Sequence, residues 1–212
     1  MGEIFESSKE GLSNMAMSVD NKLVGVVFFE DQIRPSVKDV IEKTKRVGVK
    51  KWIMLTGDNP VIAQKVAAKV AVDEAIPSMT AGAKMKFIEK YKHSLSGKKY
   101  LAMIGDGVND AAALALSDIS FAMGVAGSDA AIEASDISIM DDDLEKIPMI
   151  MNLGKETLKI VGQIFGIWAV TNMIGLILVF SGVLSPTGAA TYNFLTDFLP
   201  IFNAFRINLS KS

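Results

Sequence analysis

The sequence predicts an α/β domain, built as a parallel sheet sandwiched by helices, followed by a hairpin of two transmembrane helices. Short apolar segments alternate with amphipathic ones up to about residue 145, which is typical of a parallel sheet covered on both faces. The charge is unevenly distributed: nearly all of it lies in residues 1–160, and residues 161–196 carry none. That contrast divides the chain into a polar part and a membrane part.

The composition narrows the possible functions. The chain has 212 residues and a net charge of −2, so we expect no basic surface for nucleic acid. It has no cysteine, which excludes disulfides, thiolate metal sites and a cysteine nucleophile. The single histidine, His93, lies in a polar segment and is interpreted as a solvated surface residue. The methionines are scattered through predicted strands and helices, and we interpret them as core filling.

The predicted elements follow one another in a regular order. A hairpin comes first, with Asp20-Asn21 as its tight turn. Ser36 is expected to cap the first helix, whose apolar positions follow the helical period. Predicted strands lie at 14–19, 22–29, 52–55, 75–76, 100–104, 119–124 and 137–140. Predicted helices lie at 37–47, 61–70, 83–93, 110–116 and 129–134.

The stretch from Ile104 to Asp110 is the most informative part of the sequence. Asp106 stands between two glycines directly after a buried strand, at the strand end where open α/β sheets place their ligands. Asn109 and Asp110 fall at the start of the next helix, where such side chains cap free backbone N–H groups. Oxygen ligands at a strand end predict a Mg²⁺ and phosphate site. The alternative is an ordinary Asp-Gly turn followed by a helix cap.

A second strand end has the same character. Thr56, Gly57 and Asp58 bring together a hydroxyl, an unobstructed backbone N–H and a carboxylate after the strand at 52–55. Two such ends in one parallel sheet suggest a crevice for phosphoryl transfer. Lys84 opens a helix between them, where it could neutralise charge on a phosphoryl group. The alternative for Lys84 is a solvated surface lysine.

The last third of the chain predicts two membrane spans. A linker helix at 146–160 precedes an uncharged run at 161–184, and about 20 apolar residues are enough to cross a bilayer. A second apolar run spans 189–209. Positive residues flank the outer ends of the pair and none lies in the turn between them, which by the positive-inside rule places both ends in the cytoplasm. The alternative is a buried helical hairpin in a larger soluble protein.

Several motifs of this chain resemble one family. They resemble the phosphorylation domain of P-type ATPases, in the haloacid dehalogenase-like superfamily, and they occur in that family's order. The two-span ending is also similar, and its closing residues are similar to those of the heavy-metal-transporting branch. In chain order, the motifs are Asp31–Pro35, Thr56–Asn59, Lys84, Gly105–Asp110, Gly127–Asp136 and Asn203–Arg206.

The resemblance implies a haloacid dehalogenase-like, Rossmann-type fold and a role for each site residue. Asp106 would bind Mg²⁺, and Asp110 would support that metal site. The residues that bind phosphate and serve catalysis would be Thr56, Gly57, Asp58, Lys84 and Asn109, with Asp110 beside them.

The resemblance also implies a function. The chain is expected to be the carboxyl-terminal portion of an ATP-driven heavy-metal cation transporter, with Mg²⁺ as cofactor and ATP as the substrate of the complete pump. Residues 1–20 would be the end of a nucleotide-binding domain, and residues 21–145 the core of the phosphorylation domain. The protein would lie in the cell membrane, in contact with lipid, with both termini and the α/β domain in the cytoplasm. Its cargo would be a metal cation.

The sequence departs from the family in one catalytic feature. The family's phosphorylated aspartate lies in an Asp-Lys-Thr-Gly-Thr motif, which this sequence does not contain. We therefore expect the isolated chain to be inactive. The sequence leaves open whether it is a fragment of a whole pump or a subunit of a split pump, in which a second polypeptide would carry the nucleophile, the nucleotide-binding part and the actuator part. The alternatives are a catalytically silent, membrane-anchored regulator, an inert fragment, or a small phosphatase that uses Asp31 as its nucleophile.

Two polar residues of the second predicted span bear on the cargo. Copper pumps of the family carry Met-x-x-Ser-Ser there, whereas this chain has Asn193-x-x-Thr196-Asp197. Oxygen ligands suit harder divalent ions than Cu(I), and a carboxylate at mid-membrane is costly and usually functional. Asn193 and Asp197 are therefore candidate ligands of the transported cation. The alternative is that they form hydrogen bonds between helices.

Overall fold

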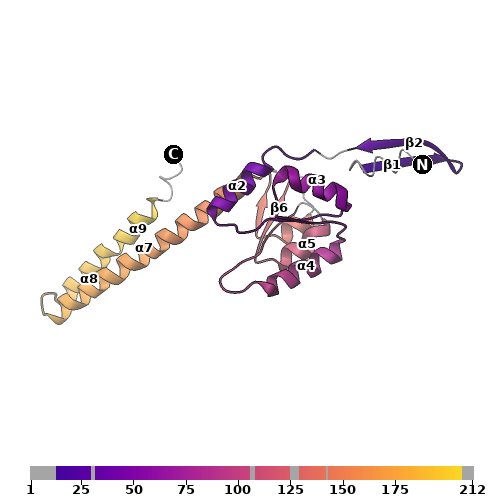
Figure 1. Cartoon of the computed structure of the whole chain (residues 1–212). Helices are drawn as coiled ribbons and strands as arrows, with labels where there is room; N and C mark the ends of the chain where they lie inside the picture. The colour runs from indigo at the N-terminus through magenta and orange to yellow at the C-terminus, as the bar shows by residue number, and fades with distance from the viewer. Residues whose placement is uncertain (1–12, 30–31, 106–107, 125–128, 142, 207–212) are drawn as a thin grey trace. The chain divides into compact units, whose positions relative to one another are not determined.

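The chain forms two compact units, residues 1–148 and 149–212. The computed structural model describes residues 13–29, 32–105, 108–124, 129–141 and 143–206. Figure 1 shows the order of the elements along the chain. The first unit contains strands, short helices and most of the charged side chains, and the second contains helices only.

A β-hairpin opens the described part of the chain. Strands β1 (Ser13–Val19) and β2 (Lys22–Phe29) pair antiparallel, as predicted. Asp20 and Asn21 both have positive φ, 47° and 60°, which is the backbone conformation that a tight two-residue hairpin turn requires. The pairing register shifts between Met17 and Ser18, so the hairpin contains a bulge.

The remaining strands are parallel, as predicted, but they form two sheets instead of one. Strand β3 (Ile53–Leu55) pairs with β4 (Glu74–Ile76). The second sheet has the order β5-β6-β7, with β5 at Ala102–Gly105, β6 at Ile119–Met123 and β7 at Ile137–Ile139. Within the described residues, β3 and β5 each pair along one edge only. The expectation of one continuous sheet is therefore wrong for this part of the chain.

Amphipathic helices separate these strands. Helix α2 (Val37–Val47) buries Val40, Ile41 and Thr44 and ends at Gly48, whose φ of 121° suits glycine. Ser36 makes no side-chain cap bond, because its backbone is helical and not in the extended conformation of a capping residue. The predicted cap is therefore wrong. The other helices of this unit are α3 (Pro60–Val70), α4 (Ala81–Ser94), α5 (Ala111–Leu116) and α6 (Asp129–Glu133), with the 3₁₀ turn η1 (Val108–Asp110) before α5.

One apolar cluster joins the three-stranded sheet to its helices. Leu114 of α5 is almost fully buried, and it packs with Ile88 of α4 and Met103 of β5. Small buried residues, including Ala113 and Ala122, allow helix and sheet to approach closely. Leu55 of β3 packs against the same cluster. The cluster therefore ties the elements that carry the predicted site residues to one core.

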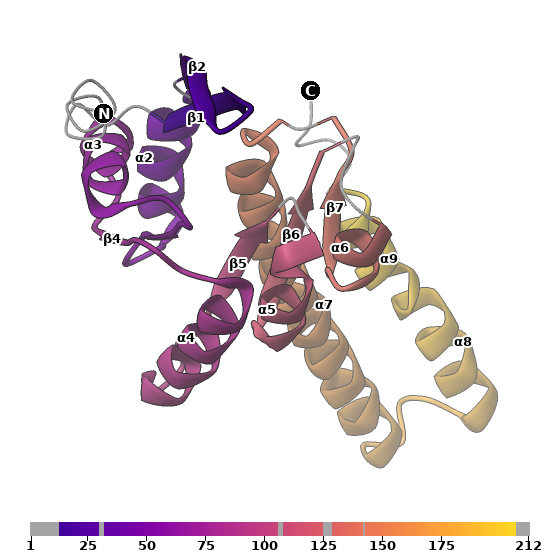
Figure 2. The ribbon, with the colours of Figure 1, turned by 90° about the vertical axis from the view of Figure 1, so that its right-hand side faces the viewer.

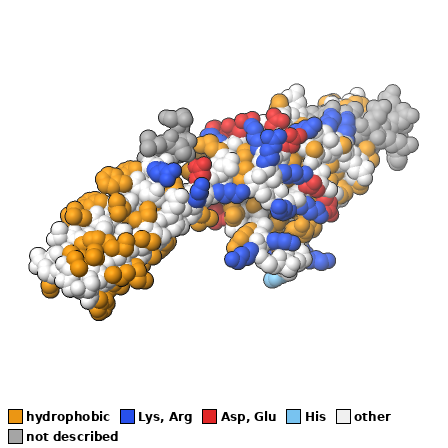
Figure 3. Space-filling model, turned by 60° about the vertical axis from the view of Figure 1, so that its left-hand side comes forward, with side chains coloured by type: hydrophobic (Ala, Val, Ile, Leu, Met, Phe, Trp, Pro, Cys, Tyr) orange, Lys and Arg blue, Asp and Glu red, His pale blue; other side chains and the backbone are white. Residues whose placement is uncertain are grey.

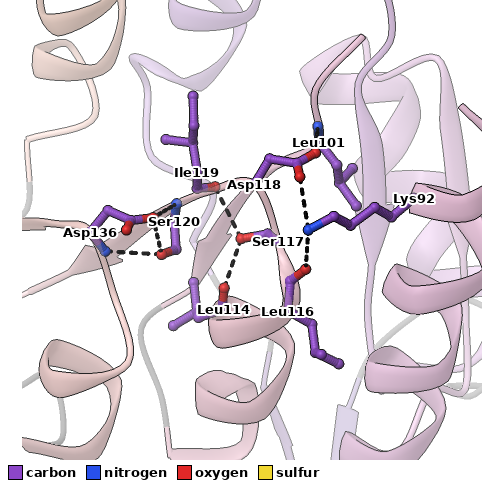
Figure 4. Close-up of polar contacts among 9 residues, drawn as sticks. All are labelled: Lys92, Leu101, Leu114, Leu116, Ser117, Asp118, Ile119, Ser120 and Asp136. Atoms are coloured by element: carbon purple, nitrogen blue, oxygen red, sulfur yellow. Dashed lines mark hydrogen bonds and ion pairs between the residues drawn. The ribbon is translucent and has the colours of Figure 1, made fainter. Parts of the chain in front are cut away.

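Aspartates hold the amino ends of neighbouring strands together. Asp118, just before β6, accepts hydrogen bonds from the Leu101 backbone N–H at 2.8 Å and from Lys92 Nζ (Figure 4). Asp136, just before β7, accepts bonds from both the backbone N–H and the hydroxyl of Ser120. These carboxylates lie at the strand ends opposite to the predicted site, so their role is structural.

The second unit begins within a single long helix. Helix α7 (Lys146–Phe180) merges the predicted linker helix and most of the predicted first span. It is long and apolar enough to cross a membrane. It ends four residues before the predicted limit, and Gly182 follows with a φ of 75°, a conformation that suits glycine after a helix.

The second predicted span is two short helices in the structure. Helix α8 (Pro186–Thr196) is capped by the Ser185 hydroxyl, and α9 (Phe198–Ala204) follows after Asp197. Pro200 has no N–H to donate to the Thr196 carbonyl, which explains the interruption. Asp197 keeps a helical backbone, so the chain does not change direction sharply there. The last residues of the predicted span, 207–209, lie outside the described residues.

Helices α8 and α9 return alongside α7 (Figure 2). The Tyr192 hydroxyl donates to the Thr171 carbonyl at 2.9 Å, and Asn203 Nδ2 donates to Gln163 Oε1 at 3.2 Å. Gly175 leaves room for the Tyr192 ring, since a Cβ there would lie 2.9 Å from it. The outward faces of this unit are apolar and exposed, as the orange surface in Figure 3 shows and as Phe165 and Phe202 illustrate.

Candidate functional site

The first part of the candidate site lies at the carboxyl end of β3. The Thr56 hydroxyl donates to Asp58 Oδ2 at 2.6 Å, and the Asp58 backbone N–H donates back to the same hydroxyl at 3.2 Å. This pair fixes both side chains in a tight loop. A Cβ at Gly57 would lie 3.6 Å from the Met79 carbonyl oxygen, an ordinary contact. Space alone therefore does not require glycine at position 57.

The second part of the site is an ion pair between α4 and the segment after β5. Lys84 Nζ lies 2.9 Å from Asp110 Oδ1, and the two side chains are only 17% and 13% exposed. Asp110 makes no side-chain cap bond to α5: its backbone is helical, and its carboxylate binds Lys84. The expectation that Asp110 caps a helix is therefore wrong. The solvated-lysine alternative for Lys84 is also wrong.

Gly105 makes this ion pair possible. A Cβ at this last residue of β5 would lie 2.9 Å from the Asp110 Cβ, closer than real Cβ contacts come. The absence of a side chain at position 105 lets the 3₁₀ turn η1 fold back on the strand end. Glycine is therefore required here by packing, in contrast to Gly57.

Of the remaining predicted residues of this site, the structure describes Asn109 but not Asp106. Asn109 lies in η1 and is exposed at the same strand end as Asp110. Asp106, the predicted Mg²⁺ ligand, lies outside the described residues, as does Asp31. Within the described ranges, no three acidic or histidine side chains gather closely enough to hold a metal ion. The described oxygen groups of this site are carboxylates, a hydroxyl and an amide, which are the donor types that Mg²⁺ accepts.

The loop between β4 and α4 also contacts the site, although the sequence reasoning did not identify it. The Ser78 backbone N–H donates to the Asp58 carbonyl at 2.7 Å, and the Met79 N–H donates to the Thr56 carbonyl at 2.9 Å. Thr80 then caps α4, the helix that carries Lys84. A Ser-x-Thr sequence between a strand and a helix was the available signal, but such turns are too common to indicate a site by themselves.

The two polar residues of the second unit lie on one helical surface. Asn193 belongs to α8, and Asp197 lies at its junction with α9. They are four residues apart, so they occupy the same face of the helix. Both are exposed, whereas Tyr192 and Thr196 beside them are half-buried. The side-chain hydrogen bonds from this pair of helices to α7 are made by Tyr192 and Asn203.

A model of a known protein family matches a large part of this chain. Residues 4–118 match the family described as haloacid dehalogenase-like hydrolase. The match includes Thr56, Asp58, Lys84 and Asp110, the residues that form the two described parts of the site.

Relatives with assigned functions are metal-transporting pumps. The chain is 34% identical to the manganese-exporting P-type ATPase of Mycobacterium leprae, over 91% of this chain and 26% of that protein. It is 37% identical to the "Probable cadmium-transporting ATPase" of Listeria monocytogenes, over 86% of this chain and 25% of that protein. The chain thus spans about a quarter of the length of the curated relatives it matches.

A solved structure matches both units. A zinc-transporting PIB-type ATPase in the E2.Pi state is 26% identical, with a TM-score of 0.80 over 97% of this chain and 33% of that one. The catalytic CPx-ATPase domain CopB-B is 32% identical over 64% of this chain and 53% of that one, with a TM-score of 0.55. The family model, the parallel strands and the order of the site residues together show that the chain belongs to the haloacid dehalogenase-like hydrolase family, and its relatives are heavy-metal-transporting P-type ATPases.

Proposed function

We propose that this chain is the carboxyl-terminal portion of an ATP-driven heavy-metal cation pump. It supplies the phosphate and Mg²⁺ site of the phosphorylation domain together with the last two membrane spans. The ion pair between Lys84 and Asp110 is the observation that carries this proposal, because it holds a cation at a strand end where the family handles phosphoryl groups.

The positive charge of Lys84 is unfavourable at its position unless an anion lies beside it. It lies near the amino end of α4, where the helix dipole disfavours positive charge. Asp110 compensates for that cost within the described structure. A phosphoryl group would provide a second anionic partner for the same ammonium group, and charge on that group would be stabilised in the transition state.

Thr56 and Asp58 provide the opposite wall of the proposed phosphate site. The Thr56 hydroxyl can donate one hydrogen bond, and in the described structure Asp58 accepts it. A phosphoryl oxygen would take over that bond, and the exposed backbone of Gly57 would add an N–H donor. Asn109, exposed beside Asp110, would add a side-chain amide donor.

The donor chemistry fits Mg²⁺ as the cofactor. Asp106 would be its direct ligand, and Asp110 would support the site through its carboxylate, which Lys84 already orients. When bound, Mg²⁺ neutralises charge on phosphoryl oxygens.

The phosphorylated nucleophile and the nucleotide-binding part must come from other residues. Strands β3 and β5 each have an edge that pairs with no other described strand, and both end at the site. A further parallel strand ending in an aspartate would complete the pairing and deliver the nucleophile to this position. A second polypeptide is one source of such a strand.

The membrane part would carry the cation path. Helix α7 and the pair α8–α9 would span the cell membrane with the α/β unit and both ends in the cytoplasm. Asn193 and Asp197 would face the transported cation with oxygen ligands, which suit divalent ions. Relatives named for manganese and cadmium transport agree with that class of cargo.

Acid-stable labelling from γ-labelled ATP tests the proposal. Membranes that contain the protein are labelled, separated by size and blotted for this chain. We expect label on a polypeptide that contains or co-purifies with it. Lys84→Met should lower the label at least about tenfold. Lys86→Met removes an exposed charge from the same helix and should leave the label within about twofold.

Three results would contradict the proposal in different ways. Absence of label, in membranes where other pumps do label, would favour the silent regulator or inert fragment. Label on this chain at its own mass would reveal an unforeseen nucleophile, with Asp31 as the first residue to test. An equal loss of label in Lys84→Met and Lys86→Met would show that the Lys84–Asp110 ion pair has no special role in phosphorylation.

A further inference from the structure

A short loop connects the two walls of the proposed phosphate site. Residues 77–80 join β4 to α4. On one side, the backbone N–H groups of Ser78 and Met79 donate to the carbonyls of Asp58 and Thr56, at 2.7 and 2.9 Å. The loop therefore binds the Thr56–Asp58 turn through its main chain at two successive residues.

The same loop holds the helix that carries Lys84. The Thr80 hydroxyl accepts a hydrogen bond from the Ala83 N–H at 3.2 Å, and the Thr80 carbonyl accepts one from the Lys84 N–H at 2.9 Å. Thr80 thus bonds to the first turn of α4 with both its side chain and its backbone. Its neighbour Met79 bonds to the other wall, so only one peptide link separates the two attachments.

The first turn of α4 is made of small residues. It consists of Ala81, Gly82 and Ala83, and a Cβ added at Gly82 would meet no atom within 4 Å. Residues this small offer little side-chain surface for packing, so the cap by Thr80 helps to fix the end of the helix from which Lys84 extends to Asp110.

Ser78 sets the direction of the loop. Its φ of 56° is left-handed, a conformation that costs a side-chain-bearing residue free energy and is kept where the surrounding structure demands it. With this backbone conformation, the Ser78 N–H points toward the Asp58 carbonyl, and the chain then continues to Thr80 at the start of α4.

We infer that Ser78 and Thr80 are positioning residues that couple the Thr56–Asp58 wall of the site to Lys84. The inference rests on the proposed function for the identity of the ligand, but the coupling itself is a property of this chain. A substitution at Thr80 should therefore weaken the backbone hydrogen bonds to the Thr56–Asp58 turn. A substitution at Ser78 should weaken those at the start of α4, near Lys84.

Amide hydrogen exchange on the full chain in lipid nanodiscs tests the coupling without any ligand. Thr80→Ala should speed exchange at the amides of Ser78, Met79 and Lys84 by at least about fivefold, and Thr80→Ser should restore it. Ser185→Ala is the matched control, because the Ser185 hydroxyl caps α8 through a bond of the same length, 3.2 Å, from Gly188. It should leave these three amides unchanged. Faster exchange confined to α4 would overturn the inference.

Substitutions at Ser78 test the backbone requirement. Glycine adopts positive φ freely, so Ser78→Gly should leave exchange at Lys84 within about twofold of the original protein. Ser78→Val places a β-branched residue in a left-handed conformation and should speed exchange there as Thr80→Ala does. Equal behaviour of the two variants would contradict the role assigned to Ser78.

Binding of inorganic phosphate distinguishes this inference from the proposed function. Titration in the presence of Mg²⁺, followed by ³¹P NMR, should show at least about fivefold weaker binding for Thr80→Ala, and near-original binding for Thr80→Ser and Ser185→Ala. Unchanged binding in a folded Thr80→Ala variant would overturn the positioning role. Failure of the original protein to bind phosphate would count against the proposed phosphate site, while the exchange data would still decide the coupling.

Discussion

At the scale of single residues, the position of an aspartate along its strand determines its role. Asp73, Asp118 and Asp136 precede strands, and each accepts a backbone N–H at the start of the neighbouring strand. Asp58 and Asp110 follow strands, and they bind a threonine hydroxyl and a lysine instead. A carboxylate at the amino end of a strand therefore stabilises the sheet, whereas a carboxylate at the carboxyl end belongs to the candidate site.

The stabilising aspartates make the α/β unit sensitive to acid. The backbone N–H of Leu101, and then Lys92, hold the pKa of Asp118 below its ordinary value. The hydroxyl and the backbone N–H of Ser120 lower the pKa of Asp136 in the same way. A carboxyl group with a depressed folded-state pKa contributes stability above its unfolded value, about 3.9, and loses it as the pH falls through the folded value.

Asp118→Asn should remove part of this acid sensitivity. The amide oxygen can still accept from Leu101, but it cannot titrate or pair with Lys92. We expect lower stability at neutral pH and a shallower loss of stability below about pH 4. Urea unfolding between pH 3 and 7 measures both. Asp20→Asn, in the hairpin turn, is the control, and an equal change in slope for the two variants would contradict the prediction.

At the scale of elements, one close contact sets how α8 lies on α7. The Tyr192 ring fills the space that Gly175 leaves, and its hydroxyl reaches the Thr171 carbonyl one turn earlier. Small residues at such positions allow helices in membranes to approach, and hydrogen bonds between helices then fix their alignment. Gly166, on the same helix, has no such neighbour within 4 Å of an added Cβ.

Gly175→Ala should therefore destabilise the helix pair, while Gly166→Ala should not. Overpacking costs about 1–3 kcal/mol, which exceeds the roughly 1 kcal/mol that alanine gains over glycine in a helix. Thermal unfolding in detergent micelles, followed by helical circular dichroism, measures the difference. A lower midpoint for both variants, or for neither, would show that the Tyr192 contact does not determine the packing.

At the scale of the whole molecule, the chain combines a charged α/β unit with an apolar helical unit. The proposed phosphate site lies in the first unit and the proposed cation path in the second. Asp197 is the acidic residue within the apolar helices α8 and α9, and it lies where Pro200 interrupts them. An interrupted helix in a membrane leaves carbonyl groups available to a cation as well.

Asp197→Ala in a reconstituted pump that contains this chain should lower cation-stimulated ATP hydrolysis at least about tenfold, because a carboxylate ligand is lost. Asp197→Glu should retain part of the activity. Membrane insertion, checked by extraction at alkaline pH, should be unchanged in both. Transport at the original rate by an inserted Asp197→Ala variant would refute the role in the cation path.

Local patterns in the sequence determined the secondary structure and most of the candidate site residues. Alternation of apolar and amphipathic segments predicted the parallel strands and their helices, since burial on a strand or helix follows from periodicity. The uncharged run predicted the long apolar helix α7. The motifs at the ends of β3 and β5 identified Thr56, Asp58 and Asp110, and Lys84 was identified at the start of the helix between them. The structure shows these four residues bonded in two pairs.

The partners of these residues were decided only by the tertiary structure. Asp110 binds Lys84, 26 residues earlier in the chain, and not the helix end beside it. The strands divide into two sheets, and the loop at Ser78–Thr80 joins the two walls of the site. Periodicity reports which face of an element is buried, but not which distant element lies against it. Ion pairs and hydrogen bonds between segments depend on which distant elements pack together, so only the folded structure reveals them.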